Sequence, residues 1–196
     1  MDDSSDEAQA SRFKDTTVWR SAGLALAAFL ALALAPIQPI YFPVMDQLQP
    51  ADAVMVMGPP EQSRLDLARD LVERGYAQEM VISAGNSPGP YSIRSTRFCM
   101  EPQVFPVHCE QSAPFTTEGE VAFMARLAED RSWDSVIFIT FTPHVTRAQL
   151  YADRCFPGTS VVLSDGVEQP LERLAIQYFY QTGGFVKALF TSDECP

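Results

Sequence analysis

Hydrophobic residues follow two different patterns along the chain, and the first is one long uncharged run. No charged residue occurs from Ser21 to Met45, and the middle of this run is almost entirely Ala and Leu. At about 1.5 Å per helical residue, residues 18–40 are long enough to cross a hydrocarbon core about 30 Å thick. A helix buried in a soluble core usually keeps a polar side for water, which this run lacks. The pattern predicts a transmembrane helix at 18–40, after a tail at 1–17.

The second pattern is an alternation of short apolar runs with amphipathic segments, which begins after a Pro-rich linker at 41–50. The apolar runs contain few polar residues, as is typical of strands buried on both faces. Such strands are expected at 53–57, 80–82, 103–108, 136–140 and 161–163. Apolar residues at helical spacing predict helices at 61–75, 118–130, 146–154 and 171–190.

The alternation of strands and helices predicts one extracytoplasmic α/β domain over 51–196. Its helices are expected to cover both faces of a mostly parallel sheet, in a three-layer α/β/α arrangement. Residues 86–102 are rich in Pro, Gly and Ser and are expected to form a loop. Gly183 and Gly184 are expected to interrupt the last helix.

The apolar run could also be a signal peptide that is cleaved after Ala35. The small residues of Ala33-Leu34-Ala35 fit a peptidase site, but Pro36 follows directly, and the region before the run is long and acidic instead of short and basic. These features favour an uncleaved anchor. Three basic residues, Arg12, Lys14 and Arg20, precede the run, and the next basic residue is Arg64. The positive-inside rule therefore predicts a single-pass protein of the cell membrane with a cytoplasmic N-terminus.

All four cysteines fall in the predicted extracytoplasmic domain. An even number of cysteines in an oxidising compartment indicates disulfides, and four cysteines allow three pairings. We expect Cys99 to pair with Cys109 and close a short loop, and Cys155 to pair with Cys195 and hold the C-terminus. No CxxC pair is present, and the two histidines and scattered carboxylates form no recognisable metal-ligand set. The sequence indicates no metal and identifies no cofactor.

The predicted domain is acidic. Residues 46–196 contain 20 Asp and Glu against 11 Lys and Arg, a net charge of 11 − 20 = −9. Such a domain repels a phosphate backbone, so no nucleic-acid partner is expected. Any anion-binding site would have to concentrate its few arginines in one place.

Ligands of open parallel sheets bind beyond the carboxyl ends of the strands, near the point where the strand order reverses. The residues directly after the predicted strands are therefore the candidates for a site. They are Gly58-Pro59-Pro60, Ser83-Ala84-Gly85-Asn86, His108-Cys109-Glu110 and the stretch from Thr140 to His144. The chain has no GxGxxG and no Walker sequence, and prolines at 59 and 60 make a poor phosphate cradle.

Two arginines stand near the start of predicted helices, where the helix dipole favours anions. Arg64 needs compensation there by an acid such as Asp66 or by an anionic ligand. Arg147 lies three residues after His144, a spacing that places both on one helical face. Thr117-Glu118-Gly119-Glu120 matches a capping box, in which Thr117 would bond the N3 amide and Glu120 would reach back to the cap.

Four segments in this order resemble the SanA/YdcF/ElyC-like family of bacterial envelope proteins. They are "ADAVMVMG", "RLDLARDLVERGYAQEMVISAG", "EQSAPFTTEGEV" and "FITFTPHVTRAQLYADRCF", and the resemblance covers about residues 51–165. It implies a Rossmann-like domain, often with one N-terminal anchor, linked to envelope or peptidoglycan-precursor metabolism. The residues that match the family pattern are Gly58, Arg64, Ser83, Gly85, Glu110, Ser112, Thr117, His144, Arg147 and Ala148.

Three hypotheses follow for the site. In the first, Arg64 and Arg147 hold an anionic, phosphate-bearing envelope precursor or lipid carrier, His144 is a general acid or base, and Glu110 orients it or shares the proton. Hydroxyls of Ser83, Ser112 or Thr117 would add contacts, next to Gly58 and Gly85. In the second, the same cleft belongs to a non-catalytic binding or scaffolding module. In the third, His144 is a structural residue at a helix N-terminus.

Overall fold

The computed structural model of the protein describes residues 3–190 and residue 195, with side chains described from Trp19 onward. The chain divides into two units, residues 1–38 and residues 39–196, and each is described by itself. The side chains of the predicted cytoplasmic tail, Arg12 and Lys14 included, lie outside the described residues.

The first unit is mostly one helix, α1 (Asp3–Leu34). It ends just before Pro36, and the short α2 (Ile37–Tyr41) follows. The helical segment Trp19–Tyr41 is long and apolar enough to cross a membrane. This candidate span agrees within one residue with the segment 18–40 that the sequence predicts.

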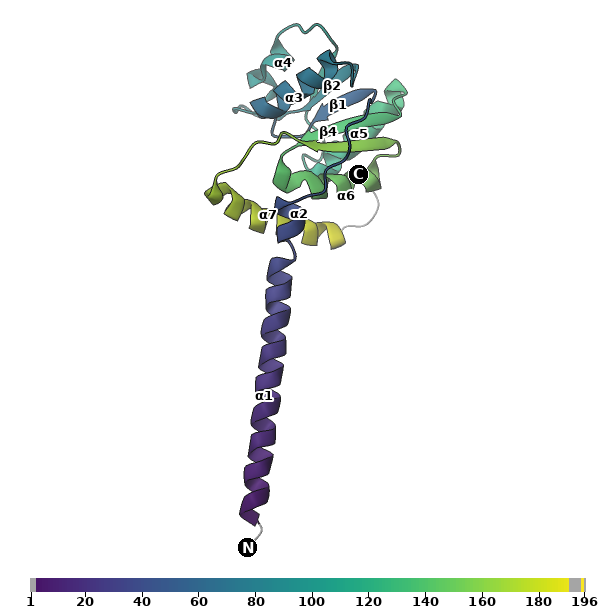
Figure 1. The fold of residues 1–196 in the computed structure, drawn as a ribbon. Helices are drawn as coiled ribbons and strands as arrows, with labels where there is room; N and C mark the ends of the chain where they lie inside the picture. The colour runs from purple at the N-terminus through teal and green to yellow at the C-terminus, as the bar shows by residue number, and fades with distance from the viewer. Residues whose placement is uncertain (1–2, 191–194, 196) are drawn as a thin grey trace. The chain divides into compact units, whose positions relative to one another are not determined.

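The second unit contains a five-stranded sheet in which every neighbouring pair of strands is parallel, in the order β3-β2-β1-β4-β5. The strands are β1 (Ala53–Val56), β2 (Glu79–Ser83), β3 (Val107–Glu110), β4 (Ser135–Thr140) and β5 (Thr159–Ser164). Helices cover both faces of the sheet, so the α/β prediction is confirmed (Figure 1). The remaining helical elements are α3 (Gln62–Glu73), η1 (Ile93–Ser95), α4 (Arg97–Met100), α5 (Thr117–Arg131), η2 (Thr142–His144), α6 (Val145–Cys155) and α7 (Leu171–Phe190).

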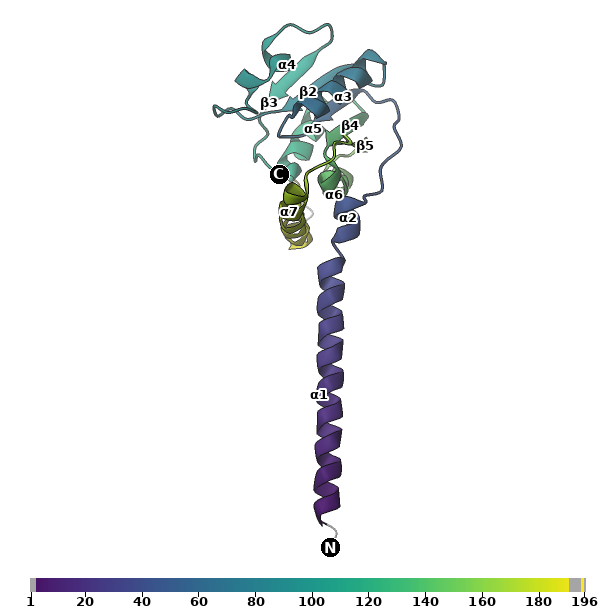
Figure 2. The same ribbon diagram turned by 60° about the vertical axis from the view of Figure 1, so that its left-hand side comes forward.

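Alternate residues of each central strand enter two separate cores. In β1, Val54 and Val56 pack with the α3 residues Leu65 and Ala68 on one face. Met55 packs on the other face, with residues of α5 and α6. All four residues of β1 are fully buried, which explains why the strand reads as a continuous apolar run. Figure 2 shows α7 beside α6, a packing that the contacts between these two helices also record.

Three local predictions were wrong. The loop expected at 86–102 contains η1 and α4, and the third strand begins at Val107 instead of residue 103. Gly183 and Gly184 do not interrupt α7, which continues to Phe190. By contrast, Gly75 follows Arg74, the C-cap residue of α3, with φ +78°, as expected of a glycine that ends a helix.

Both disulfide pairings are confirmed. Cys99 is bonded to Cys109, and Cys155 to Cys195. The first bond joins α4 to strand β3. The second joins the last residue of α6 to the chain beyond α7 and so closes a loop that contains α7.

Candidate functional site

The candidate site is a cleft at the carboxyl ends of β1 and β4. These strands are neighbours, yet the chain continues from β1 towards β2 on one side and from β4 towards β5 on the other, so the strand order reverses between them. This is the position at which open α/β sheets bind ligands. The cleft has a volume of about 690 Å³, and Gly58 and His144, which follow these two strands, both line it.

His144 is almost fully buried and lies between two hydroxyl groups. Its Nδ1 is 2.7 Å from Thr140 Oγ1, and its Nε2 is 3.0 Å from Thr117 Oγ1. Burial, followed by the charges of Arg147 and Arg64, lowers the pKa of His144 well below its ordinary value of 6.5. The imidazole is therefore neutral at pH 7, and one of its nitrogens is a hydrogen-bond acceptor.

The hydrogen bonds around Thr117 favour one tautomer of His144. Arg147 Nη1 donates to Thr117 Oγ1 at 3.0 Å, so the hydrogen of the Thr117 hydroxyl is free to point at His144 Nε2. His144 then carries its proton on Nδ1 and donates it to Thr140 Oγ1. In this arrangement the Thr117 hydroxyl accepts a hydrogen bond from the guanidinium and donates one to the imidazole.

The capping box predicted at the start of α5 is wrong, and the correction places two residues in the cleft. The N-cap is Thr116, whose Oγ1 accepts from the Gly119 amide at 3.2 Å. Thr117 is the first residue of the helix, and its side chain is turned towards His144. Glu120 does not reach back to the cap, because its Oε1 accepts from the Gly58 amide at 2.7 Å.

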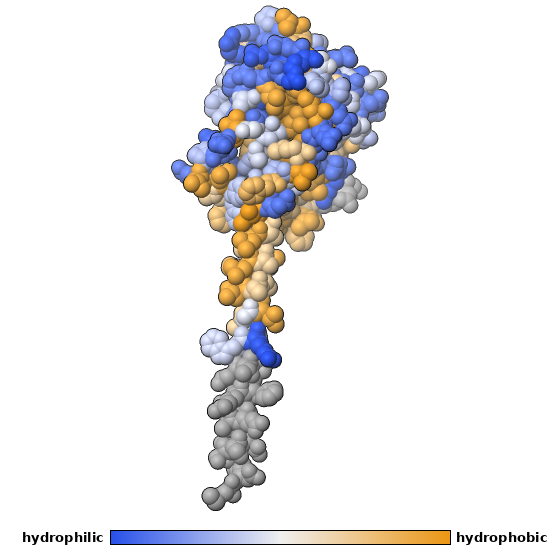
Figure 3. Space-filling model, viewed as in Figure 1, coloured by the Kyte–Doolittle hydropathy of each residue, from blue (hydrophilic) through white to orange (hydrophobic). Residues whose placement is uncertain are grey.

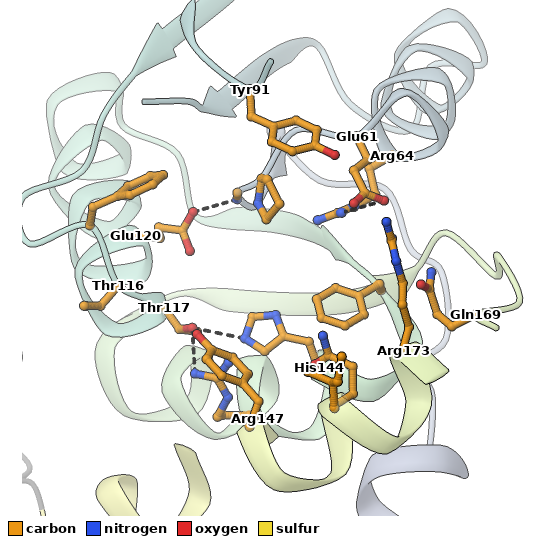
Figure 4. A pocket seen from close by; sticks show the side chains of 17 residues that line it. Glu61, Arg64, Tyr91, Thr116, Thr117, Glu120, His144, Arg147, Gln169 and Arg173 are labelled. Carbon is orange, nitrogen blue, oxygen red and sulfur yellow. Dashed lines mark hydrogen bonds and ion pairs between the residues drawn. The ribbon is translucent and has the colours of Figure 1, made fainter. Parts of the chain in front are cut away.

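Glu120 is 4% exposed and lines the cleft opposite His144 (Figure 4). Burial raises the pKa of Glu120 above its ordinary value of 4.5, and this outweighs the opposing effects of the Ser83 hydroxyl, the Gly58 amide and the two arginines. A carboxyl group with a raised pKa is suited to donate a proton. A β-carbon at Gly58 would lie 3.1 Å from Glu120 Oε1, so a glycine here allows the carboxyl to approach the backbone.

Arg147 is held by neutral groups. Its Nε donates to the buried Gln181 Oε1 at 2.8 Å, and its guanidinium lies 5.6 Å from the centre of the Tyr180 ring. Within the described part of the chain, no carboxylate lies at ion-pair distance from Arg147. Burial lowers the pKa of Arg147, but a guanidinium keeps its charge at neutral pH. No carboxylate of the described residues therefore pairs directly with its positive charge, although Glu120 acts on it at longer range.

Arg64 also lines the cleft, but acids of the protein compensate it. Its Nη2 is 3.2 Å from Glu61 Oε2 and its Nε is 3.6 Å from Asp165 Oδ2. The residue is 1% exposed. Asp66, the partner suggested by the sequence, instead accepts hydrogen bonds from Arg69 and Gln62 on the helix surface. Arg64 thus contributes charge at the floor of the cleft.

Several predicted site residues do not line the cleft. Glu110 is exposed at the end of β3, and it cannot orient His144 because β3 is the edge strand, two strands away from β1. Thr140 and Thr117 orient His144 instead. Ser112 is buried in the loop before α5, and Gly85 hydrogen-bonds Tyr91 and Ile93. Ser83 is fully buried beside Glu120, behind the cleft surface.

Several residues that line the cleft had no signal in the sequence that would select them. Arg173 and Tyr180 come from α7, which is distant in sequence from the strand ends, and Phe115, Phe141 and Tyr91 add aromatic surface. Glu120 had a signal, its position one helical turn after Thr117, but that spacing was assigned to the capping box. In total, the charged residues of the lining are three arginines and two glutamates.

Comparison of the chain with protein-family models, curated proteins and solved structures finds no match. The described residues include no group of three or more His, Cys, Asp or Glu side chains placed to hold a metal ion. The cleft thus combines a neutral imidazole, a carboxyl group with a raised pKa and a guanidinium that has no direct carboxylate partner among the described residues.

Proposed function

We propose that this is a membrane-anchored protein of the cell envelope whose extracytoplasmic cleft binds an anionic, phosphate-bearing ligand, either an envelope precursor or a lipid carrier. The observation that carries the proposal is the environment of Arg147. This arginine lines the cleft, has only neutral hydrogen-bond partners and lacks a carboxylate at ion-pair distance among the described residues. An anionic ligand would supply the missing charge with charge-assisted hydrogen bonds.

Two further observations support an anionic ligand. Besides Arg147 and Arg64, Arg173 adds a third cleft-lining guanidinium, from the first turn of α7. The domain has a net charge of −9, yet three of the five charged residues that line the cleft are arginines. Local positive charge in an acidic protein raises the concentration of an anion at that place and not elsewhere on the surface.

The location rests on the N-terminal segment and the cysteines. The segment Trp19–Tyr41 supplies an anchor, and both disulfides belong to the unit that follows it. Disulfides persist in oxidising compartments, and basic residues precede the span, which together support an extracytoplasmic domain and a cytoplasmic N-terminus.

The acid and base of the cleft support a hydrolase or transferase. Titratable groups whose pKa values are shifted by burial in one cleft are typical of acid–base sites, and here the shifts bring the pKa values of His144 and Glu120 closer together. In hydrolysis of a phosphate ester, His144 would accept the proton of the attacking water through the Thr117 hydroxyl. Glu120 in its protonated form would give its proton to the leaving oxygen. This assignment replaces Glu110 by Glu120 as the carboxyl partner of His144.

A second candidate function is a binding module without catalysis. The observation in its favour is that His144 is 3% exposed and already satisfied by two hydroxyl groups. In that case the imidazole positions Thr117 and Arg147 for binding only.

The test uses the full chain in lipid nanodiscs and isothermal titration with two probes, sn-glycerol 3-phosphate and dodecyl phosphate. Replacing Arg147 by Gln removes one charged hydrogen-bond donor, worth about 1.5–3 kcal/mol, so we expect affinity to fall about 10- to 100-fold. Arg74→Gln, at an exposed arginine directly after α3 and outside the cleft, is the control and should leave affinity unchanged. Equal affinity of Arg147→Gln and wild type would refute anion binding by this cleft.

Native mass spectrometry of the purified chain identifies a ligand that is retained during purification. With that ligand, a His144→Ala variant separates the two candidate functions. Binding that persists while turnover disappears favours the enzyme, whereas loss of binding with no turnover in the wild type favours the binding module.

A further inference from the structure

Helix α7 carries its apolar side chains on the outside of the domain. Of its twenty residues only Glu172, Arg173 and Lys187 are charged. The large apolar residues that it exposes are Leu171, Ile176, Phe179, Tyr180, Val186, Leu189 and Phe190. Phe179 is 74% exposed and Phe190 86%. A surface helix of a soluble domain has the opposite arrangement, with its apolar stripe turned inward.

The face of α7 that packs against the domain is the more polar and smaller one. Gln181 is fully buried, where it accepts from Arg147 and donates to Gln177. Ala188 is also fully buried. Figure 3 shows apolar surface on the side of the domain where α7 lies. The outward apolar face is too continuous to be explained by single exposed hydrophobic residues.

This apolar face adjoins the residue at which the candidate membrane span ends. Tyr41 is the last residue of the span, and its hydroxyl donates to the Leu174 carbonyl of α7 at 2.7 Å. The next residues continue the apolar surface, since Phe42 is 70% exposed and Val44 is 76% exposed. Tyr41 and Phe42 also form one side of an apolar groove of about 680 Å³. The other side of the groove includes Leu171, Leu174 and Ala175 of α7.

We propose that α7 lies in the plane of the membrane, with its outward face inserted at the boundary between lipid head groups and acyl chains. The end of the span sets the depth of α7 in the membrane. The hydrogen bond between Tyr41 and Leu174 keeps α7 at the level at which the chain leaves the bilayer. An amphipathic helix with large aromatic and aliphatic side chains on one face is suited to this position. The domain is acidic, so apolar burial and not attraction to anionic lipids holds the helix there.

This placement affects the cleft, whichever ligand it binds. Arg173, Ile176 and Tyr180 line the cleft from one edge of α7, while Leu171, Leu174 and Ala175 line the apolar groove from the other. The cleft therefore opens at the depth of the lipid head groups. The inference about α7 does not depend on the proposed function, because it rests on surface residues and the end of the span.

The test measures contact between α7 and lipid directly. The full chain with Trp19→Phe is reconstituted in vesicles of zwitterionic phosphatidylcholine, and a reporter is introduced by Phe179→Trp or, in a second variant, Leu189→Trp. Phosphatidylcholine brominated on its acyl chains quenches only indoles that reach the acyl region. We expect both reporters to lose most of their emission, and more with shallow than with deep bromines. Raising the salt concentration should not reverse the loss.

The matched control is Val104→Trp in the same background, which places the reporter on a 95% exposed loop residue outside α7. This variant, and the native Trp133 common to all of them, should keep their emission in brominated lipid. If the α7 reporters behave like Val104→Trp and are quenched by aqueous iodide, the helix faces water and the proposal is wrong. If neither brominated lipid nor iodide quenches them, a second copy of the chain covers the face, and the proposal is equally wrong.

Discussion

The two walls of the cleft each carry an arginine in the first turn of a helix that follows a central strand, but the arginines are compensated in opposite ways. On the α3 wall, Arg64 is buried against Glu61 and Asp165. On the wall formed by α6 and α7, Arg147 contacts a threonine, a glutamine and a tyrosine ring. One charge is balanced within the protein, and the other remains available to a ligand.

This difference indicates how a cleft can be both stable and receptive to an anion. A buried charge without a partner costs several kcal/mol, so a fold must pair it or leave it partly accessible. Arg64 follows the first course and contributes to the structure. Arg147 follows the second, and α7 is the element that orients it. Substitutions on the α3 wall should therefore lower mainly the stability of the fold. Substitutions on the α7 wall should weaken mainly the binding of the ligand.

The largest expected effect belongs to Arg64→Met. This change keeps an unbranched apolar side chain but removes the guanidinium, which leaves Asp165, whose side chain is fully buried, without its cationic partner. Breaking a buried ion pair from one side costs about 3–5 kcal/mol. Urea unfolding of the full chain in detergent should show that loss. The double variant Arg64→Met, Asp165→Asn should recover part of it, and a single variant as stable as wild type would contradict the account of this wall.

Loss of the Cys155–Cys195 bond should act on the opposite wall. The bond spans 40 residues and closes a loop that contains α7. Loop-closure entropy predicts that Cys155→Ser with Cys195→Ser costs about 3–4 kcal/mol. The pair Cys99→Ser with Cys109→Ser, whose bond spans 10 residues, should cost about 2–3 kcal/mol. Only the first pair should also weaken phosphate binding in the titration; equal binding losses would show that α7 does not orient the site.

Two neighbouring glycines of α7 provide a smaller and more selective perturbation. A β-carbon at Gly184 would lie 2.9 Å from Arg147 Cδ, whereas one at Gly183 would meet nothing within 4 Å. Alanine favours a helix over glycine by up to about 1 kcal/mol at either position, so the pair differs mainly in the contact with Arg147. Gly183→Ala should be neutral or stabilising, and Gly184→Ala should cost about 1–3 kcal/mol through overpacking.

Binding of dodecyl phosphate provides the second measurement on these two variants. We expect weaker binding for Gly184→Ala only, because its β-carbon displaces Arg147 from Thr117 and Gln181. Identical affinities for the two alanine variants would mean that the position of Arg147 is not set by α7.

These glycines also show which features of the fold could be predicted from the sequence and which could not. Strands, helices and both disulfides were predictable, because periodicity and cysteine count depend on local or compositional properties. The pairing of Gly184 with Arg147 was not, since it joins residues 37 positions apart through packing of α7 on α6. From the sequence, Gly184 was expected to interrupt the helix. In the structure, its lack of a side chain leaves room for the side chain of Arg147.

The site was predictable in part for the same reason. His144, Arg147, Arg64 and Gly58 follow central strands, and the rule for parallel sheets locates them without coordinates. Glu110 also follows a strand, but the sequence does not reveal that this strand is at the edge. Glu120 was hidden because a Thr and a Glu three residues apart fit a capping box equally well, and only the Gly58 amide decides between the two arrangements.

The smallest expected effect is a change in how stability depends on pH. The pKa of His144 is lowered in the folded state, so below pH 6.5 the unfolded chain gains a proton that the folded chain does not, and stability falls as pH falls. The pKa of Glu120 is raised, so above pH 4.5 the unfolded chain loses a proton that the folded chain keeps, and stability falls as pH rises. The two contributions oppose each other between these values.

Removing one group should therefore expose the other. Glu120→Gln keeps an oxygen for the Gly58 amide and should make stability rise more steeply with pH between 4.5 and 6.5 than in wild type. His144→Gln should change the slope in the opposite direction. Glu118→Gln, two residues away on the same helix, is the control and should leave the slope as it is in wild type. Urea unfolding at a series of pH values measures all four slopes, and parallel curves for the Glu120 and His144 variants would show that burial does not shift the two pKa values.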